Sequence, residues 1–326
     1  MGVNILGLNV ELLIQHGDKL FVPIVEEGIS WATERKGCPG QLQFNVINDG
    51  ILAITEGDAV RLRVNDSNVF YGFIFSLKRD KNQIISVTAY DQLRYLKNKD
   101  TYVYENKTAG ELVKMIADDF NMQTGDIENT GYKIASRVEE NTSLFDMIQN
   151  ALDITLENRS KMYVMYDDFG KITLKSLDNM YLNILIDEET CENFDYTSSI
   201  DNETYNKIKL TYDNEETGTR EVYIAQDGNN INAWGILQHF DTIQKGENGK
   251  AKADALLSLY NQKTRNLSIK NALGDARVRA GSLIPVILNL GDVKVQNFML
   301  VEKCKHEFKQ NQHLMNLTLR GGEFIA

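Results

Sequence analysis

The sequence predicts a mainly β protein in which two similar antiparallel β domains flank one α+β domain. Three observations support this: short alternating strands fill the first hundred residues, helical spacing begins near residue 101, and alternating strands return after about residue 195. A chain of 326 residues and 37.0 kDa has room for two or three domains. We therefore expect domains over residues 1–100, 101–195 and 196–326.

The first domain is expected to be a small barrel or a sandwich. Gln41–Ile47 alternates apolar and polar residues, and Glu56–Val64 does so again after a turn. Phe70–Leu77 and Ile84–Tyr90 follow, separated by a charged turn. Short strands at about ten-residue spacing, with turns between them, are typical of these two architectures.

Helical spacing marks the second domain. Thr108–Phe120 has apolar residues on one face, and its Thr108 and Glu111 form a capping box that predicts where the helix starts. A second helix is expected from Ser143 to about Leu156. A hairpin should follow, closed by the turn Asp167–Gly170. We therefore expect two helices and a β-hairpin in this domain.

The third region returns to strands. Tyr205–Tyr212 alternates and is expected to pair with Arg220–Ala225. A short helix is expected near residues 250–261, and strands resume at Arg265.

An internal similarity links the first and third regions. EGDAVRLRV (Glu56–Val64) resembles AGSLIPVIL (Ala280–Leu288), and QIISVTAYD (Gln83–Asp91) resembles HLMNLTLRG (His313–Gly321). Either two antiparallel meanders look alike by chance or the β domain is duplicated. Two similar β domains per chain would let three chains build a ring of six similar units.

The chain has little that is typical of catalysis or metal binding. Cys38, Cys191 and Cys304 are far apart and in no CxxC pair, which predicts reduced thiols and folding in the cytoplasm. His306 and His313 could approach across a hairpin, but no third ligand lies at metal spacing, so we expect surface or strand-end histidines. No hydrolase, zinc-protease or nucleotide-binding motif occurs. We expect no enzyme activity and no catalytic, cofactor-binding or metal-binding residues.

Composition and charge exclude further classes of protein. With 42% hydrophobic and 25% charged residues the chain is not globally disordered. Its 35 Lys and Arg against 46 Asp and Glu give a net charge of −11, which predicts no stable nucleic-acid binding. No run is apolar enough for a membrane segment, and Val3–Ile14 is expected to be a strand because it lacks the basic leader of a signal peptide.

Several passages together resemble one family. They include FYGFIFSLKRDKNQIISVTAYDQLRYLKNKDTYVYENKTAGELVKMIADDF, NTSLFDMIQNALD, YVMYDDFGKITLK, FDYTSSIDNETYNKIKLTYDNEETGTREVYIAQD, NAWGILQ, VRAGSLIPVIL and HEFKQNQHLMNLTLRGGEF. These resemble the XkdQ/YqbQ type of baseplate hub protein, found in contractile phage tails and phage-tail-like bacteriocins. The related late control protein D family shares the architecture. The resemblance runs from about Ile29 to the end of the chain.

The resemblance implies two tube-like antiparallel β-barrel domains and one intervening α+β domain. It also implies a homotrimeric structural hub that joins the hexameric tail tube above to the trimeric central spike below. Baseplate wedge and LysM-type tail proteins are further candidate partners. We expect assembly in the host bacterial cytoplasm and a final place in the baseplate of the particle. The chain ends at Ala326, so we expect no fused enzymatic domain.

Polar residues that alternate with buried ones are candidates for the lumen or for a face between subunits, although period-two alternation alone does not exclude an ordinary solvated face. The candidates are Arg61, Arg63, Ser86, Thr88, Lys207, Lys209, Thr211, Asn316 and Thr318. The alternative function is a tail-associated protein that binds or degrades the cell wall. It would need a catalytic carboxylate pair or an exposed aromatic platform, and we find neither motif in the sequence.

Overall fold

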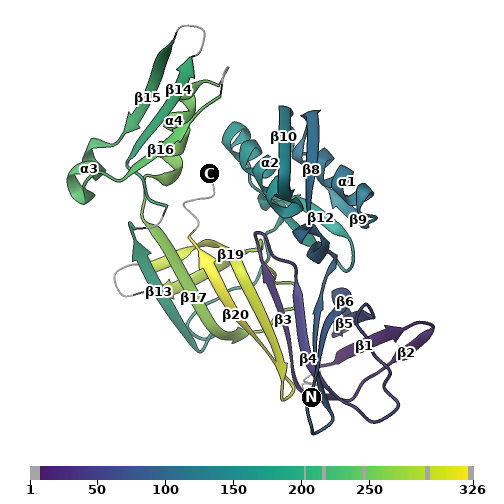
Figure 1. The fold of residues 1–326 in the computed structure, drawn as a ribbon. Coiled ribbons are helices and arrows are strands. Elements are labelled where there is room, and N and C mark those ends of the chain that lie inside the picture. Colours follow the sequence, from purple (N-terminus) through teal and green to yellow (C-terminus); the bar gives the residue numbers. More distant parts are fainter. Residues whose placement is uncertain (1–7, 202, 215–217, 245–246, 291–293, 322–326) are drawn as a thin grey trace. The chain divides into compact units, whose positions relative to one another are not determined.

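The computed structural model describes residues 8–201, 203–214, 218–244, 247–290 and 294–321 (Figure 1). Strands dominate and helices are few, so the mainly β prediction is confirmed. The chain divides into two compact units: one runs to Asp195 and resumes at Ser268, and the other runs from Tyr196 to Leu267. Within the described residues no helix is both long and apolar enough to cross a membrane.

The first β module is a five-stranded antiparallel arrangement in the larger unit. Its strands are β3 (Val25–Glu34), β4 (Gln41–Ile47), β5 (Ala59–Val64), β6 (Ser67–Arg79) and β7 (Ile84–Tyr90). They lie in the order β3-β4-β7-β6-β5. The hairpin β1 (Val10–His16) and β2 (Lys19–Phe21) extends the sheet beyond β5. The strand expected over Val3–Ile14 is thus described from Val10, and residues 1–7 lie outside the described residues.

The second β module repeats this strand order. Its strands are β13 (Asn193–Ser199), β17 (Thr264–Leu273), β18 (Leu283–Asn289), β19 (Lys294–Lys309) and β20 (Gln312–Arg320). They lie in the order β13-β17-β20-β19, with β18 paired to β19. The chain order and the sheet order of the five strands are therefore the same in both modules.

Individual hydrogen bonds repeat as well. Gly57 N–H donates to the Ile74 carbonyl at 2.8 Å, and Gly281 N–H donates to the Val301 carbonyl at 2.7 Å. A β-bulge follows in both modules, directly after Ile74 in β6 and directly after Val301 in β19. A chance likeness of two meanders does not predict matching bulges and turns. Of the two interpretations that the sequence left open, these repeated features support the duplication, with EGDAVRLRV and AGSLIPVIL at equivalent places.

The two modules share one sheet. β19 continues past the end of β18 and pairs antiparallel with β3, from Lys303 opposite Glu34 to Phe308 opposite Ile29. In Figure 1 the yellow β19 accordingly lies between the yellow β20 and the purple β3. The result is a twelve-stranded sheet, and no closed barrel is found among the described residues.

The α+β part of the larger unit follows the first module. It contains η1 (Gln92–Lys97), β8 (Lys99–Lys107), α1 (Ala109–Asp119), β9 (Thr124–Ile127), β10 (Ile134–Ser143), α2 (Leu144–Arg159), β11 (Tyr163–Asp167), β12 (Ile172–Ser176) and η2 (Leu177–Asn179). The predicted capping box of Thr108 and Glu111 starts α1, and the predicted hairpin is β11–β12. Leu112, Ile116, Leu144 and Ile148 are buried in one apolar core. Both predicted helices are therefore confirmed.

The smaller unit is a mixed sheet with one main helix. It contains β14 (Lys207–Asn214), β15 (Thr219–Gln226), α3 (Gly228–Trp234), β16 (Gln238–Thr242) and α4 (Gly249–Tyr260). β14 is central, antiparallel to β15 as predicted and parallel to β16. Ile208, Leu210, Ala253 and Leu256 form part of its core. The predicted short helix is α4.

Candidate assembly interface

Six of the nine polar candidates lie on one face of the twelve-stranded sheet. They alternate with core residues such as Val60, Val87 and Leu317, which are at most 2% exposed. The six are Arg61 and Arg63 on β5, Ser86 and Thr88 on β7, and Asn316 and Thr318 on β20. Because side chains alternate across a strand and registered partners share a face, all six point to the side opposite the core.

The duplication makes four of these residues equivalent in pairs. Lys303 pairs with Thr318 directly after the bulge in β19, just as Ser76 pairs with Thr88 directly after the bulge in β6. Asn316 lies two residues before Thr318 in β20, and Ser86 lies two residues before Thr88 in β7. The sequence therefore selected the same two positions in both copies.

The polar face is continuous across the seam between the modules. Lys305 is opposite Asn316 on one side and Ala32 on the other, and Ala32 is opposite Gln41 on β4. In the first module Gln43 is opposite Thr88, and Thr88 is opposite Ser76. Apart from Ala32, the residues along these rows from β20 to β6 are uncharged polar side chains and lysines. Such a face is suited to contact water.

The arginine candidates lie at the β5 side of this face. The Arg61 guanidinium lies 5.8 Å from the centre of the Tyr71 ring. Tyr71 in turn contacts Phe169 in the turn of the β11–β12 hairpin, with ring centres 5.8 Å apart. Arg63 forms an ion pair with Glu11 on β1 at 3.5 Å. These two side chains are therefore engaged within the chain.

The last three candidates lie on β14 in the smaller unit. Lys207 and Lys209 are partly exposed, and the Lys209 ammonium lies 6.0 Å from the centre of the Phe240 ring. Thr211, which was expected to point outward, is only 2% exposed. The expectation for Thr211 is wrong, because its side chain is buried although Lys207 and Lys209 on the same face of β14 are partly exposed.

The seam between β3 and β19 has an aromatic and imidazole core. The ring of His306 stacks on Trp31 with centres 4.7 Å apart. Its Nε2–H donates to the Val278 carbonyl at 2.8 Å, and its Nδ1 accepts from His313 Nε2 at 2.8 Å. The expected surface position of the histidines is wrong for His306, which has no exposed area. Hairpin pairing brings the two histidines together as the sequence suggested, but Trp31 of β3 covers His306.

Burial decides the charge state of this pair. It lowers the pKa of His306 to about 3 and that of His313 to about 4, so both imidazoles are neutral at neutral pH. Burial also raises the pKa of the neighbouring Cys304 thiol, whose sulfur lies 3.1 Å from His306 Nε2. In the described part of the chain no group of three or more His, Cys, Asp or Glu side chains is arranged to hold a metal ion. The histidines therefore act as packing and hydrogen-bonding groups of the seam.

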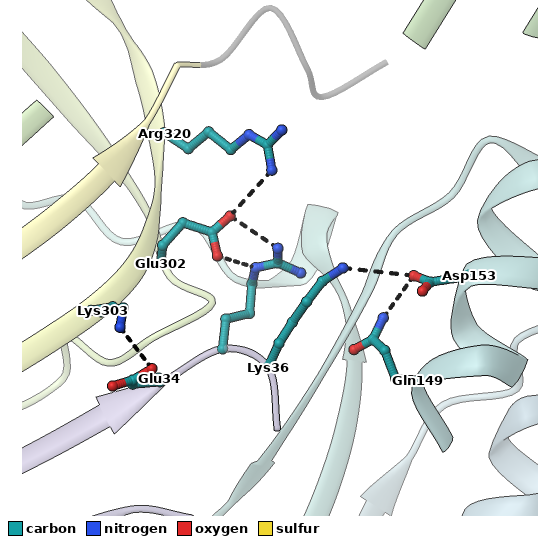
Figure 2. A network of polar contacts seen from close by, with 8 residues as sticks. Glu34, Lys36, Gln149, Asp153, Glu302, Lys303 and Arg320 are labelled. Carbon is teal, nitrogen blue, oxygen red and sulfur yellow. Dashed lines mark hydrogen bonds and ion pairs between the residues drawn. The ribbon is translucent and has the colours of Figure 1, made fainter. Parts of the chain in front are cut away.

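Ion pairs cross the seam at its upper end and reach α2 (Figure 2). Arg35 donates twice to Glu302, from Nε at 2.8 Å and from Nη2 at 2.9 Å. Lys303 pairs with Glu34 at 2.9 Å beside it. A paired, two-pronged arginine–carboxylate contact is stronger and more directional than an exposed ion pair. These contacts fix the end of β3 against β19.

A buried charge cluster ties both β modules to the α+β part. Asp91 accepts from Gly40 N–H at 2.8 Å and from Leu93 N–H at 3.0 Å. Burial raises the pKa of Asp91, with the Asp167 charge adding to the effect, and burial raises the pKa of Asp167 to about 6. The nearby cation is Arg279, whose Nη1 donates to the Asp167 carbonyl at 2.7 Å. Sequence analysis missed this cluster because its members are far apart in the chain.

Comparison with known proteins identifies the family. The YqbQ-like family model matches residues 29–320. The chain belongs to the YqbQ-like family. It is similar to YqbQ of Bacillus subtilis strain 168, with 29% identity over 92% of this chain and 93% of that protein. It is also similar to the phage-like element PBSX protein XkdQ of the same strain, with 27% identity over 93% of this chain and 94% of that protein.

Solved structures of low sequence identity share the fold. The 43 kDa tail protein of prophage MuSo2 from Shewanella oneidensis has a TM-score of 0.72 at 11% identity, covering 95% of this chain and 98% of that one. The E. coli c3393 protein has a TM-score of 0.59 at 11% identity, covering 96% of this chain and 78% of that one. It is described as a type VI secretion component that resembles the T4 tail proteins gp27 and gp5. This YqbQ-like protein thus shares its fold with a phage tail protein and with a type VI secretion component.

Proposed function

We propose that this protein is a trimeric baseplate hub, an adaptor between the hexameric tail tube and the trimeric central spike. The duplication is the observation that carries the proposal. A protein that joins a six-fold partner to a three-fold partner needs six similar contact places on three chains. Two equivalent β modules per chain supply that number.

The joined polar face supports a role around a channel. In this proposal each module is a tube-like domain whose barrel is completed in the assembled ring. Ser86, Thr88, Asn316 and Thr318 then face the lumen, with Arg61 and Arg63 near its rim. Lys207 and Lys209 belong to a face toward other subunits or partners.

The comparisons support the same setting. XkdQ is named for a phage-like element, and the c3393 protein is described as similar to gp27 and gp5. We propose tail tube and spike proteins as the direct partners, with baseplate wedge and LysM-type tail proteins as further candidates. The chain is proposed to act without catalysis, to assemble in the bacterial cytoplasm and to end in the baseplate of the particle.

The mass in solution tests the proposal. Light scattering on the purified chain, alone and mixed with the spike protein of the same particle, should give about 111 kDa for the hub component, three times 37.0 kDa. A monomer under both conditions would contradict the hub role. Turbidity of a peptidoglycan suspension is the second readout: we expect no clearing, and clearing would favour the wall-degrading alternative.

A further inference from the structure

Part of one edge of β6 has no partner strand among the described residues. β5 pairs with β6 only as far as Ala59 opposite Phe73, and β7 occupies the other edge. No strand of the described residues pairs with β6 from Phe75 to Arg79 on the β5 side. The equivalent stretch of β19, beyond Glu302, is covered by β3 through the pairs from Lys303 to Phe308. The partner strand that β3 provides for β19 is therefore missing on the equivalent stretch of β6.

The matching open edge lies on β13. In the first module β3 has β4 on one side and β19 on the other. Among the strands that the structure describes, its counterpart β13 pairs only with β17 and ends the sheet. Each chain therefore has one complete β19–β3 seam and the two unpaired halves of a second one.

We propose that β6 of one copy pairs antiparallel with β13 of the next copy and so repeats the internal seam between chains. This deepens the proposed hub function and rests on it, because the partner is a second copy of this chain. The contact is head-to-tail, so three copies close a ring in which every β6 and every β13 edge is used. It also covers strand edges that would otherwise promote aggregation.

The side chains of the two strands support a defined register. β13 alternates like β3, with Phe194 and Tyr196 partly buried where Ile29 and Trp31 are buried. With Phe194 taken as the equivalent of Ile29, and Tyr196 as the equivalent of Trp31, Thr197 occupies the position of Ala32. Since Lys305 is opposite Ala32 in the internal seam and Lys78 is equivalent to Lys305, Lys78 lies opposite Thr197.

The same register replaces each internal contact with another compatible one. Lys303 and Glu34 form an ion pair in the internal seam, and Ser76 and Ser199 occupy the equivalent positions in the proposed seam between chains. His306 stacks on Trp31 in the internal seam. In the proposed seam, Arg79 takes the place of His306 and Tyr196 that of Trp31, which pairs a cation with an aromatic ring.

The bulge position follows the same rule. Glu302, which is bonded to Arg35 in the internal seam, is replaced by Phe75 facing Ile200. A charged pair at one seam is thus an apolar pair at the other. Across the pairs from Phe75 to Arg79, no position places like charges or a charge against an aliphatic side chain, and directly beyond β6 the same register sets Asp80 opposite Asp195.

Burial points the same way. Cys304 of β19 is 1% exposed because β3 covers it, whereas its equivalent Leu77 on β6 is only partly buried. Lysines on an edge strand often prevent pairing. Here Lys303 and Lys305 occupy the same places in β19 and are paired, so Lys78 does not exclude a partner strand.

Disulfide crosslinking of the full-length chain tests the inference. Lys78→Cys is combined in turn with Asn193→Cys, Asp195→Cys, Thr197→Cys and Ser199→Cys, in a background with Cys38→Ser and Cys191→Ser. Opposed residues of an antiparallel pair have Cα atoms about 5 Å apart, within disulfide range, whereas a residue four positions along the strand is displaced by about 13 Å. Lys78 and Thr197 are exposed, so these variants keep the fold.

Crosslinking and mass are measured on the same sample, with and without the spike protein. We expect interchain disulfides, up to a covalent trimer, with the yield for Thr197 at least fivefold above that for Asn193. A sample that is trimeric by mass but gives no more crosslinking than the single-cysteine variants would overturn the strand pairing and leave the hub proposal standing. A maximum at another of the four positions would overturn the register. A sample that stays monomeric would overturn both.

Discussion

Replacing Arg279 with methionine is expected to lower the free energy of unfolding by roughly 3 kcal/mol, because two buried carboxyl groups lose their nearby cation. The variant also loses the hydrogen bond to the Asp167 carbonyl and the contacts with Trp31 and Tyr166, whose ring centres lie 5.7 Å and 4.6 Å from the guanidinium carbon. Urea unfolding followed by tryptophan fluorescence measures the loss. Arg279 thus links the second module to the first module and to the hairpin of the α+β part.

The pH dependence separates this mechanism from a simple loss of packing. The pKa of Asp167 is raised to about 6 in the folded protein, and removing Arg279 raises it further because the cation favours the ionised form. A carboxyl group whose pKa is raised in the folded state makes the folded protein more stable as the pH falls, because the folded state then binds more protons than the unfolded state. The loss in the variant should therefore be larger at about pH 7 than at about pH 5.

Arg277→Met is the matched control. Arg277 lies two residues earlier, is exposed and pairs only with Asp275 among the described contacts, at 2.7 Å. Exposed ion pairs contribute between 0 and about 1 kcal/mol, so this variant should lose little stability at either pH. Equal losses in the two variants, or a pH-independent loss in Arg279→Met, would contradict the assigned role of the cluster.

Gly281→Ala is expected to destabilise the protein by about 2–3 kcal/mol more than Gly57→Ala. The two glycines are equivalent in the duplicated modules and have nearly the same backbone, with φ of +93° and +92°. The strain of a left-handed alanine is therefore common to both variants. They differ in their surroundings: a Cβ at Gly281 would lie 2.2 Å from Val164 Cγ1, whereas a Cβ at Gly57 would meet nothing within 4 Å.

Comparing these two variants isolates the contact between the second module and β11. Val164 is in the core and 1% exposed, so the methyl group at position 281 has no free space to enter. Thermal or urea unfolding of both variants gives the difference. Losses within about 0.5 kcal/mol of each other would show that the loop is not packed against β11. A larger loss for Gly57→Ala would contradict the account outright.

The sequence predicted strands whose two faces differ clearly in polarity. Gln41–Ile47 and Ile84–Tyr90 were expected with the bounds that the structure gives to β4 and β7. β3 was not predicted, because the register shift around Gly28 interrupts its alternation. The sequence could suggest the duplication because two strand sequences kept their length and their alternation of apolar and polar residues.

The missed features all depend on contacts between distant segments. The sequence suggested that His306 and His313 approach each other but could not show that Trp31, some 275 residues before His306, covers it. It likewise gave Asp167 only a place in a turn, since Asp91 and Arg279 come from other elements. Thr211 was expected outward because the alternation does not reveal which residues on the polar face of a strand are covered by the rest of the fold.

End-on views of the assembled protein by electron cryomicroscopy test the central claim most directly, which is that two equivalent modules per chain form a six-membered ring. Averages of the assembly should show three-fold symmetry, with six similar β domains around one channel and the two kinds alternating. A ring in which each chain contributes only one β module, or six chains around the channel, would contradict the account.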